Sequence, residues 1–195
     1  KYFLFIFITS VPFVTIIIFF LPFNNSIFSR IFPRFCGNNI INEKISLVIN
    51  MKIERLRDIR EDNELTQEDV AGMLNVKRST YTGWEIGRDT IPLIRLNIIC
   101  REFNVSFDYI MGLSKEDKGY EEIDIDAKVI GRNLKKMRKE KHLVQREIFD
   151  YLNTTSSTWS AYETGKVIIK TDFLYTVCKK YKKSVDKMLS KDTNA

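Results

Sequence analysis

The functional side chains of this sequence are mainly cations, amides and hydroxyls, which are suited to binding a ligand and not to catalysis. Its 195 residues include 31 Lys and Arg, 25 Asp and Glu and one histidine. His142 follows Lys139, Glu140 and Lys141, so we expect a surface histidine and not a metal ligand. No Cys/His cluster has zinc spacing, no glycine run forms a phosphate-cradling or dinucleotide turn, and no nucleophile has a base in a recognisable pattern. The sequence therefore predicts no catalytic residue, no metal site and no cofactor, and a protein that is not an enzyme.

The positive charge is unevenly distributed along the chain. Residues 51–114 carry 9 Lys and Arg against 11 Asp and Glu, and residues 115–128 carry 3 against 6. Residues 129–191 carry 15 against 6, a net of +9. The basic surplus lies mainly in this last region, where it would favour a polyanion such as nucleic acid.

One helical motif occurs twice, with each counterpart 78 residues downstream and no gap. The matched pairs include Leu56 and Leu134, Arg60 and Arg138, Leu65 and Leu143, Gln67 and Gln145, Leu74 and Leu152, Asn75 and Asn153, and Thr80 and Thr158. The repeat predicts two small domains, 51–114 and 129–191, joined by an acidic linker, 115–128, and followed by a tail, 192–195. Cys100 and Cys178 also coincide, within apolar helical patterns, so we expect buried thiols in a reducing cytosol and no disulfide framework.

Apolar spacing predicts five helices in the first repeat. Three are expected over 51–63, 67–74 and about 77–85, followed by one that opens at Pro92 and a short one that includes Ile110. Thr66 with Asp69 three residues later is a capping-box pattern at a helix start. Asn75 is suited to a left-handed turn before the third helix. Two short helices joined by so short a turn are typical of a helix-turn-helix domain.

The first repeat resembles the phage-repressor and Cro type (XRE-like) helix-turn-helix family. The likeness is carried by Leu56–Arg60, Leu65–Ala71, Leu74–Tyr81, Trp84–Arg88 and Asn104–Ile110. It implies an all-α protein with two tandem five-helix, lambda-repressor-like bundles. In the sequence an apolar N-terminal segment precedes these bundles. It also implies double-stranded DNA as the partner, and a structural ion pair between Arg60 and Glu85.

The resemblance assigns roles to residues of the first repeat. Those on the groove-facing part of the recognition helix would be Lys77, Arg78, Ser79 and Thr82. Arg78 is the best candidate to read a base, because a guanidinium can pair two-pronged with guanine. Gln67 would hold a phosphate at the start of the preceding helix, and Thr80 and Arg88 would contact phosphates. Gly83 departs from the pattern, because relatives commonly carry a polar or basic side chain there.

The second repeat is a looser copy. Its DNA-facing candidates by the same resemblance are Gln145, Ser156, Ser157, Thr158, Ser160 and Lys166. Its recognition helix has no cation, Val144 replaces the capping Thr66, and Phe149 replaces Ala71. Its many lysines could form a solvated face or a non-specific phosphate clamp. A third interpretation is that this copy has become a dimerisation or packing module.

The linker bears on the kind of DNA site. Its fourteen residues could reach about 46 Å when extended, and successive major grooves on one face lie about 34 Å apart. One chain could therefore occupy two grooves, and because its halves differ the site would be asymmetric. The sequence also leaves a homodimer open.

Residues 1–50 allow two main interpretations. Residues 2–23 are uncharged and apolar, long enough for a transmembrane helix, with Arg30, Arg34 and Lys44 after them. Alternatively, an over-extended reading frame precedes a true start at Met51; a soluble apolar extension is the third alternative.

These observations predict a sequence-specific, repressor-like DNA-binding regulator in the bacterial cytoplasm, associated with the nucleoid. The first alternative is a protein-interaction or antitoxin-like module. The second is a regulator tethered to the cell membrane, which requires that residues 1–50 are translated.

Overall fold

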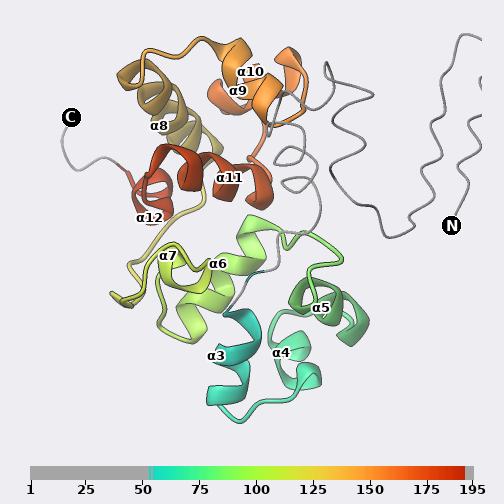
Figure 1. The fold of residues 1–195 in the computed structure, drawn as a ribbon. Helices are drawn as coiled ribbons and strands as arrows, with labels where there is room; N and C mark the ends of the chain where they lie inside the picture. Colours follow the sequence, from blue (N-terminus) through green and yellow to red (C-terminus); the bar gives the residue numbers. More distant parts are fainter. Residues whose placement is uncertain (1–52, 54, 192–195) are drawn as a thin grey trace, which may run out of the picture. The chain divides into compact units, whose positions relative to one another are not determined.

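The computed structural model describes residue 53 and residues 55–191 (Figure 1). In this part of the chain all regular secondary structure is helical, with ten helices, α3 to α12, and no strand. The all-α prediction is confirmed for these residues. None of the described helices is long and apolar enough to span a bilayer. The apolar segment 2–23, on which the membrane interpretation rests, lies outside the described residues.

The first repeat forms five helices, as predicted. They are α3 (Leu56–Asp62), α4 (Gln67–Met73), α5 (Arg78–Glu85), α6 (Leu93–Glu102) and α7 (Phe107–Ile110). Helix α3 begins later than the predicted span, because Ile53 and Arg55 are not helical. Ile53 is nevertheless buried, so its side chain contributes to the core without being part of the helix.

Local side-chain chemistry sets the ends of α4. The Thr66 hydroxyl accepts from the Asp69 backbone N–H at 3.2 Å, and the Asp69 carboxylate accepts from the Thr66 N–H at 2.8 Å. This is the predicted capping box, in which two backbone donors of the first turn are satisfied reciprocally. Asn75 has a φ of 49°, the left-handed conformation expected between the two short helices.

The second repeat also forms five helices. They are α8 (Ala127–Glu140), α9 (Gln145–Tyr151), α10 (Ser156–Glu163), α11 (Thr171–Tyr181) and α12 (Val185–Leu189). Val144 supplies no side-chain cap to α9, as predicted, although Glu147 still accepts from the Val144 N–H at 2.8 Å. Phe149 is half-buried whereas its counterpart Ala71 is fully buried, so the larger side chain lies partly at the surface.

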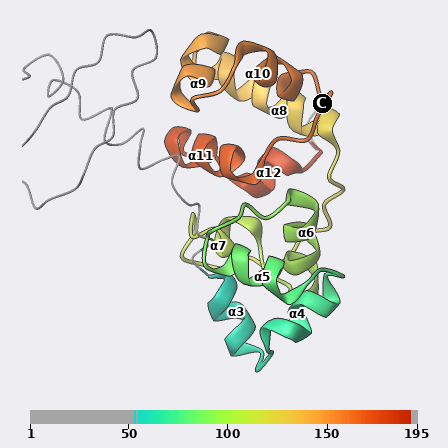
Figure 2. The same ribbon diagram turned by 90° about the vertical axis from the view of Figure 1, so that its right-hand side faces the viewer.

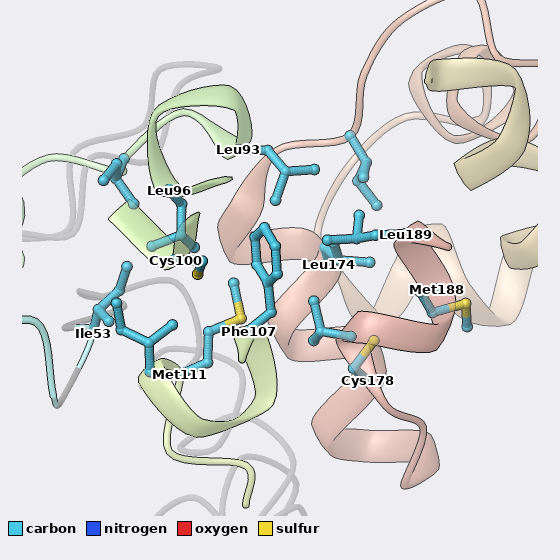
Figure 3. Close-up of a cluster of buried hydrophobic side chains, with 14 of the residues drawn as sticks. Ile53, Leu93, Leu96, Cys100, Phe107, Met111, Leu174, Cys178, Met188 and Leu189 are labelled. Atoms are coloured by element: carbon cyan, nitrogen blue, oxygen red, sulfur yellow. The ribbon is translucent and has the colours of Figure 1, made fainter. Parts of the chain in front are cut away.

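The buried side chains of the two repeats form one continuous apolar cluster. Figure 3 shows Leu93, Cys100 and Phe107 of the first repeat beside Leu174 of the second. Cys100 and Cys178 are free, buried thiols, as predicted. Burial, with nearby Asp108 and Asp186, raises the pKa of the Cys178 thiol to about 12, so it stays protonated at neutral pH.

The segment between the repeats lies along the first repeat through specific bonds. Asp117 accepts from the Ser106 N–H at 2.9 Å. The Tyr120 hydroxyl donates to the Asn97 amide oxygen at 3.1 Å, and the Asn97 amide donates to the Ile123 carbonyl at 3.0 Å. The Ile123 side chain is buried. The linker is therefore held against α6 and α7. It is not fully extended, so the maximum reach expected from its fourteen residues is not used.

Candidate nucleic-acid interface

The two helix-turn-helix units lie on the same side of the described structure. In Figure 1 the pairs α4–α5 and α9–α10 both occupy the right-hand side, and Figure 2 turns this side toward the viewer. Helices α4 and α5 pack against each other across the turn at Asn75, and α9 and α10 do so across the turn at Asn153, which has a φ of 50°. Each turn holds a recognition helix across its partner, the arrangement that places such a helix in a groove.

The outer face of α5 carries an available cation. Lys77, Arg78 and Ser79 are exposed at its first turn. Among residues 53 and 55–191, the Arg78 guanidinium has no hydrogen-bond or ion-pair partner. Its donors are thus open to a ligand that offers acceptors, such as a base edge or a phosphate. Thr80, on the same helix, is half-buried.

Gln67 and Thr82 are already bonded to each other and to the core. The Thr82 hydroxyl lies 2.9 Å from the Gln67 amide oxygen, and the Gln67 amide nitrogen donates to Glu85 at 2.7 Å. Glu85 in turn accepts from Arg60 at 2.6 Å. This chain joins α3, α4 and α5, so Gln67 and Thr82 fix the orientation of the recognition helix, a positioning role that the sequence did not reveal.

The expected ion pairs are present in both repeats. The pKa of Arg60 is raised, chiefly by its hydrogen bond to Glu85. In the second repeat Glu163 accepts from Arg138, from Gln145 at 2.7 Å and from the Trp159 indole N–H at 2.8 Å. Burial acts to raise the pKa of Glu163, but these hydrogen bonds outweigh it and the pKa is lowered. Glu163 therefore remains charged, and each of the two glutamates holds three helices together.

Arg88 belongs to the loop after α5, but its side chain lies along α5 and contacts it. Its guanidinium donates to the Ser79 carbonyl at 3.2 Å and to Asp89 at 2.8 Å. A Cβ at Gly83 would lie 2.5 Å from the Arg88 Nη2, and closer still to Asp89. The absent side chain at Gly83 thus leaves room for the Arg88–Asp89 ion pair, which brings a second guanidinium to the recognition helix. Neither the departure at Gly83 nor the resemblance indicated this arrangement.

Helix α10 presents hydroxyl groups where α5 presents cations. Thr155 caps the helix by accepting from the Thr158 N–H, and its Oγ1 lies 2.9 Å from Ser157 Oγ and 2.8 Å from Thr158 Oγ1. Ser156 and Ser157 are exposed, and Ser160 is half-buried. Lys166, the counterpart of Arg88, is exposed in the loop that follows. The second recognition surface can therefore hydrogen-bond, but its helix carries no positive charge.

The surplus lysines of the second repeat occupy several elements. Lys135, Lys136 and Lys139 lie on α8, while Lys179 and Lys180 lie on α11. The Lys180 ammonium lies 3.2 Å from the centroid of the Tyr151 ring, and Lys179 lies over Tyr175. The lysines of α11 thus contact aromatic rings of their own repeat. Lys170, which precedes α11, does so too, with its ammonium 5.6 Å from the centroid of the Phe173 ring, whereas Lys166 is exposed in the loop after α10.

The comparisons with known proteins agree with this geometry. A helix-turn-helix family model matches residues 56–110, and a helix-turn-helix domain model matches residues 131–191. The uncharacterized HTH-type transcriptional regulator YobD of Bacillus subtilis (strain 168) is 38% identical over 85 residues, which are 44% of this chain and 69% of that protein. Antitoxin PezA of Streptococcus pneumoniae serotype 4 is 26% identical over 76 residues, which are 39% of this chain. The matched region is about half (48%) of PezA, and no solved structure matches the chain.

The chain therefore belongs to the XRE-like helix-turn-helix family. It carries two such domains in tandem, as the internal repeat predicted.

Proposed function

We propose that this protein is a sequence-specific DNA-binding transcriptional regulator in which α5 reads bases in the major groove. The observation that carries the proposal is the exposed Arg78 guanidinium, without a partner in the described structure, on the outer face of a helix oriented by Gln67 and Glu85. A guanidinium in this position can donate two hydrogen bonds to guanine. Ser79 and Lys77 flank it, and Arg88 reaches the same helix. The likeness to a transcriptional regulator supports this function.

The second repeat supplies mainly phosphate contacts. Its recognition helix has hydroxyls and no cation, whereas Lys166 and Lys170 are exposed in the segment between it and α11. Ser156, Ser157, Thr158 and Ser160 can make hydrogen bonds that discriminate weakly, and lysines bind phosphates of any sequence. The protein acts on chromosomal DNA in the cytoplasm and represses by occupying its site, without catalysis.

Selection of duplexes from a random DNA pool by the full chain tests this function. We expect a recurring sequence that contains guanine in one half. Arg78→Ala should weaken binding to that sequence by roughly 1–3 kcal/mol and relax the preference for guanine. The matched control is Arg101→Ala, because Arg101 is an exposed arginine that pairs with Glu102 on α6, away from α5. Equal losses for both variants, or no selected sequence at all, would contradict the proposal.

A protein-binding function is the second candidate. It is supported by the likeness to antitoxin PezA and by the net negative charge of residues 51–114. Under this alternative the full chain would bind a protein partner through α4 and α5, and random-pool selection would return no sequence.

A further inference from the structure

The shortest helices of the two repeats meet through a reciprocal contact. Asp108 of α7 accepts from the Val185 N–H at 2.7 Å. Asp186 of α12 accepts from the Phe107 N–H at 2.9 Å and from the Asp108 N–H at 3.0 Å. Because Asp108 and Asp186 are equivalent positions of the repeat, 78 residues apart, each carboxylate binds the first turn of the helix that carries the other.

An apolar layer surrounds these bonds. Phe107 and its counterpart Val185 are fully buried, and Leu93, Leu174 and Leu189 are buried beside them. Figure 3 shows Phe107 pointing toward Leu174 and Leu189. A further bond joins the repeats where the Thr171 hydroxyl, itself buried, donates to the Ile91 carbonyl at 2.6 Å. The same face of each repeat thus packs against the other, which is the geometry of a symmetric dimer interface.

We propose that one chain binds DNA as a covalently linked pseudo-dimer, with α5 and α10 held at one separation by the α7–α12 contact. This inference rests on the proposed function. It names the ligand more closely: a duplex with two unlike half-sites at one spacing, contacted in two successive major grooves about 34 Å apart.

Three features of the structure support fixed separation over a flexible tether. The carboxylate–backbone bonds and the apolar layer join the repeats directly. The connecting segment is itself bonded to the first repeat through Asp117 and Tyr120. The pairing face is occupied within the chain, so a second copy has no access to it. Both recognition helices still lie on one side (Figure 2).

The half-sites should be unlike because the two helices differ. Helix α5 offers Arg78 and, across Gly83, Arg88. Helix α10 offers only hydroxyl groups on the equivalent surface. An arginine selects guanine, whereas serine and threonine accept several bases. One half of the site should therefore be strongly specified and the other weakly.

A spacing series on the selected duplex tests the proposal. Insertions of 2 and 5 base pairs are placed between the two segments that the full chain protects from cleavage. Because α5 and α10 are held at one separation, they cannot follow half-sites that an insertion moves apart, and we expect each insertion to weaken binding at least tenfold. Light scattering should show one chain per duplex. Smaller losses, or two chains on a palindromic duplex, would overturn the proposal.

A second measurement needs no DNA, and it separates this inference from the proposed function. Spin labels at Ser79→Cys and Ser157→Cys, in a full chain with Cys36→Ser, report the separation of α5 and α10. We expect one narrow distance distribution, which broadens when Asp108→Ala and Asp186→Ala are combined. Asp69→Ala is the matched control, because the Asp69 carboxylate also accepts from a backbone N–H at a helix start, that of Thr66 at 2.8 Å, but does so within the first repeat.

A broad distribution in the parent chain would overturn the fixed separation even if DNA binding were strong. A narrow distribution with no selected duplex would contradict the proposed function, while the fixed separation set by the α7–α12 contact would be retained. If circular dichroism shows that the double variant has lost helicity, the fixed separation is still tested by the distance distribution of the parent chain and by the spacing series.

Discussion

The guanidinium of Arg88 lies over Gly83, so that a loop cation occupies the space where a recognition-helix side chain would stand. Two exposed partners hold it there, the Ser79 carbonyl and the Asp89 carboxylate. A substitution at Gly83 should therefore change both the stability of α5 and the position of the Arg88 guanidinium on its surface.

Gly83→Ala should therefore raise stability and lower DNA affinity. A mid-helix glycine is about 1 kcal/mol less favourable than alanine, so the free energy of unfolding should rise by up to that amount. The new Cβ would displace the Arg88–Asp89 ion pair, because it would lie 2.5 Å from Arg88 Nη2 and closer still to Asp89 Oδ2. We expect a several-fold loss of affinity in gel shifts, alongside a higher midpoint in urea.

Arg88→Ala is the control for this prediction. It should lose similar affinity without any gain in stability. If Gly83→Ala stabilises the chain and binds DNA as well as the parent, Arg88 does not act from its position over the helix.

The buried ion pairs should differ in strength between the repeats. Glu85 accepts from Arg60 and Gln67, while Glu163 accepts from Arg138, Gln145 and also the Trp159 indole. Removing either carboxylate leaves a largely buried arginine without its partner, which costs about 3–5 kcal/mol. Glu163→Ala should be the worse by about 1 kcal/mol, because a buried indole N–H also loses its acceptor. Denaturant titration of the two variants measures the difference, and equal losses would contradict the prediction.

Stability should depend on pH through Asp186. Burial is the main cause that raises its pKa, and repulsion from Asp108 adds to it, although the backbone N–H groups of Phe107 and Asp108 oppose the rise. The resulting pKa is about 6, against an ordinary value near 3.8. A raised pKa means that the folded state holds the proton more tightly than the unfolded state. The contribution is therefore complete below about pH 4 and is lost as the pH rises through 6.

Comparison of the parent chain with Asp186→Asn isolates this effect from the acid unfolding of other carboxylates. The full pKa difference corresponds to about 3 kcal/mol, and partial solvent exposure reduces it to about 1–2 kcal/mol. Between pH 4 and pH 7 the parent should lose that much stability relative to the variant. The neighbouring carboxyl group is that of Asp108, and the Cys100 and Cys178 thiols nearby remain protonated in this range. A constant difference across the range would contradict the assignment.

Lys166 and Lys170 should contribute affinity without specificity. Both are exposed in the segment between α10 and α11, and lysine ammonium groups release counterions when they bind phosphates. Replacing both with alanine should weaken binding to selected and unrelated duplexes alike, and should reduce the slope of affinity against salt by about 1–2. The control pair is Lys179 and Lys180, which lie in the last turn of α11 and not in the segment between α10 and α11. A larger effect from the control pair would place the phosphate contacts on α11.

The sequence by itself determined the helices, their caps and the repetition of the fold. Thr66 and Asp69 satisfy backbone donors within one turn, and Asn75 tolerates the left-handed turn that follows, so neighbouring residues suffice to predict both features. The 78-residue register and the family's motifs predicted two five-helix domains. The apolar pattern around Cys100 and Cys178 predicted that both thiols are buried.

The tertiary structure alone decided how these parts meet. Gln67 forms a hydrogen bond with Glu85, 18 residues away, so its amide could not be assigned a partner from local spacing. The same holds for Arg88 above Gly83 and for Asp108 and Asp186, which lie 78 residues apart. A recurring Ser-Phe-Asp and Ser-Val-Asp at 106–108 and 184–186 was a visible signal, but its meaning depends on the two helices meeting. Sequence periodicity specifies which faces are apolar, and only packing specifies which of these faces come together.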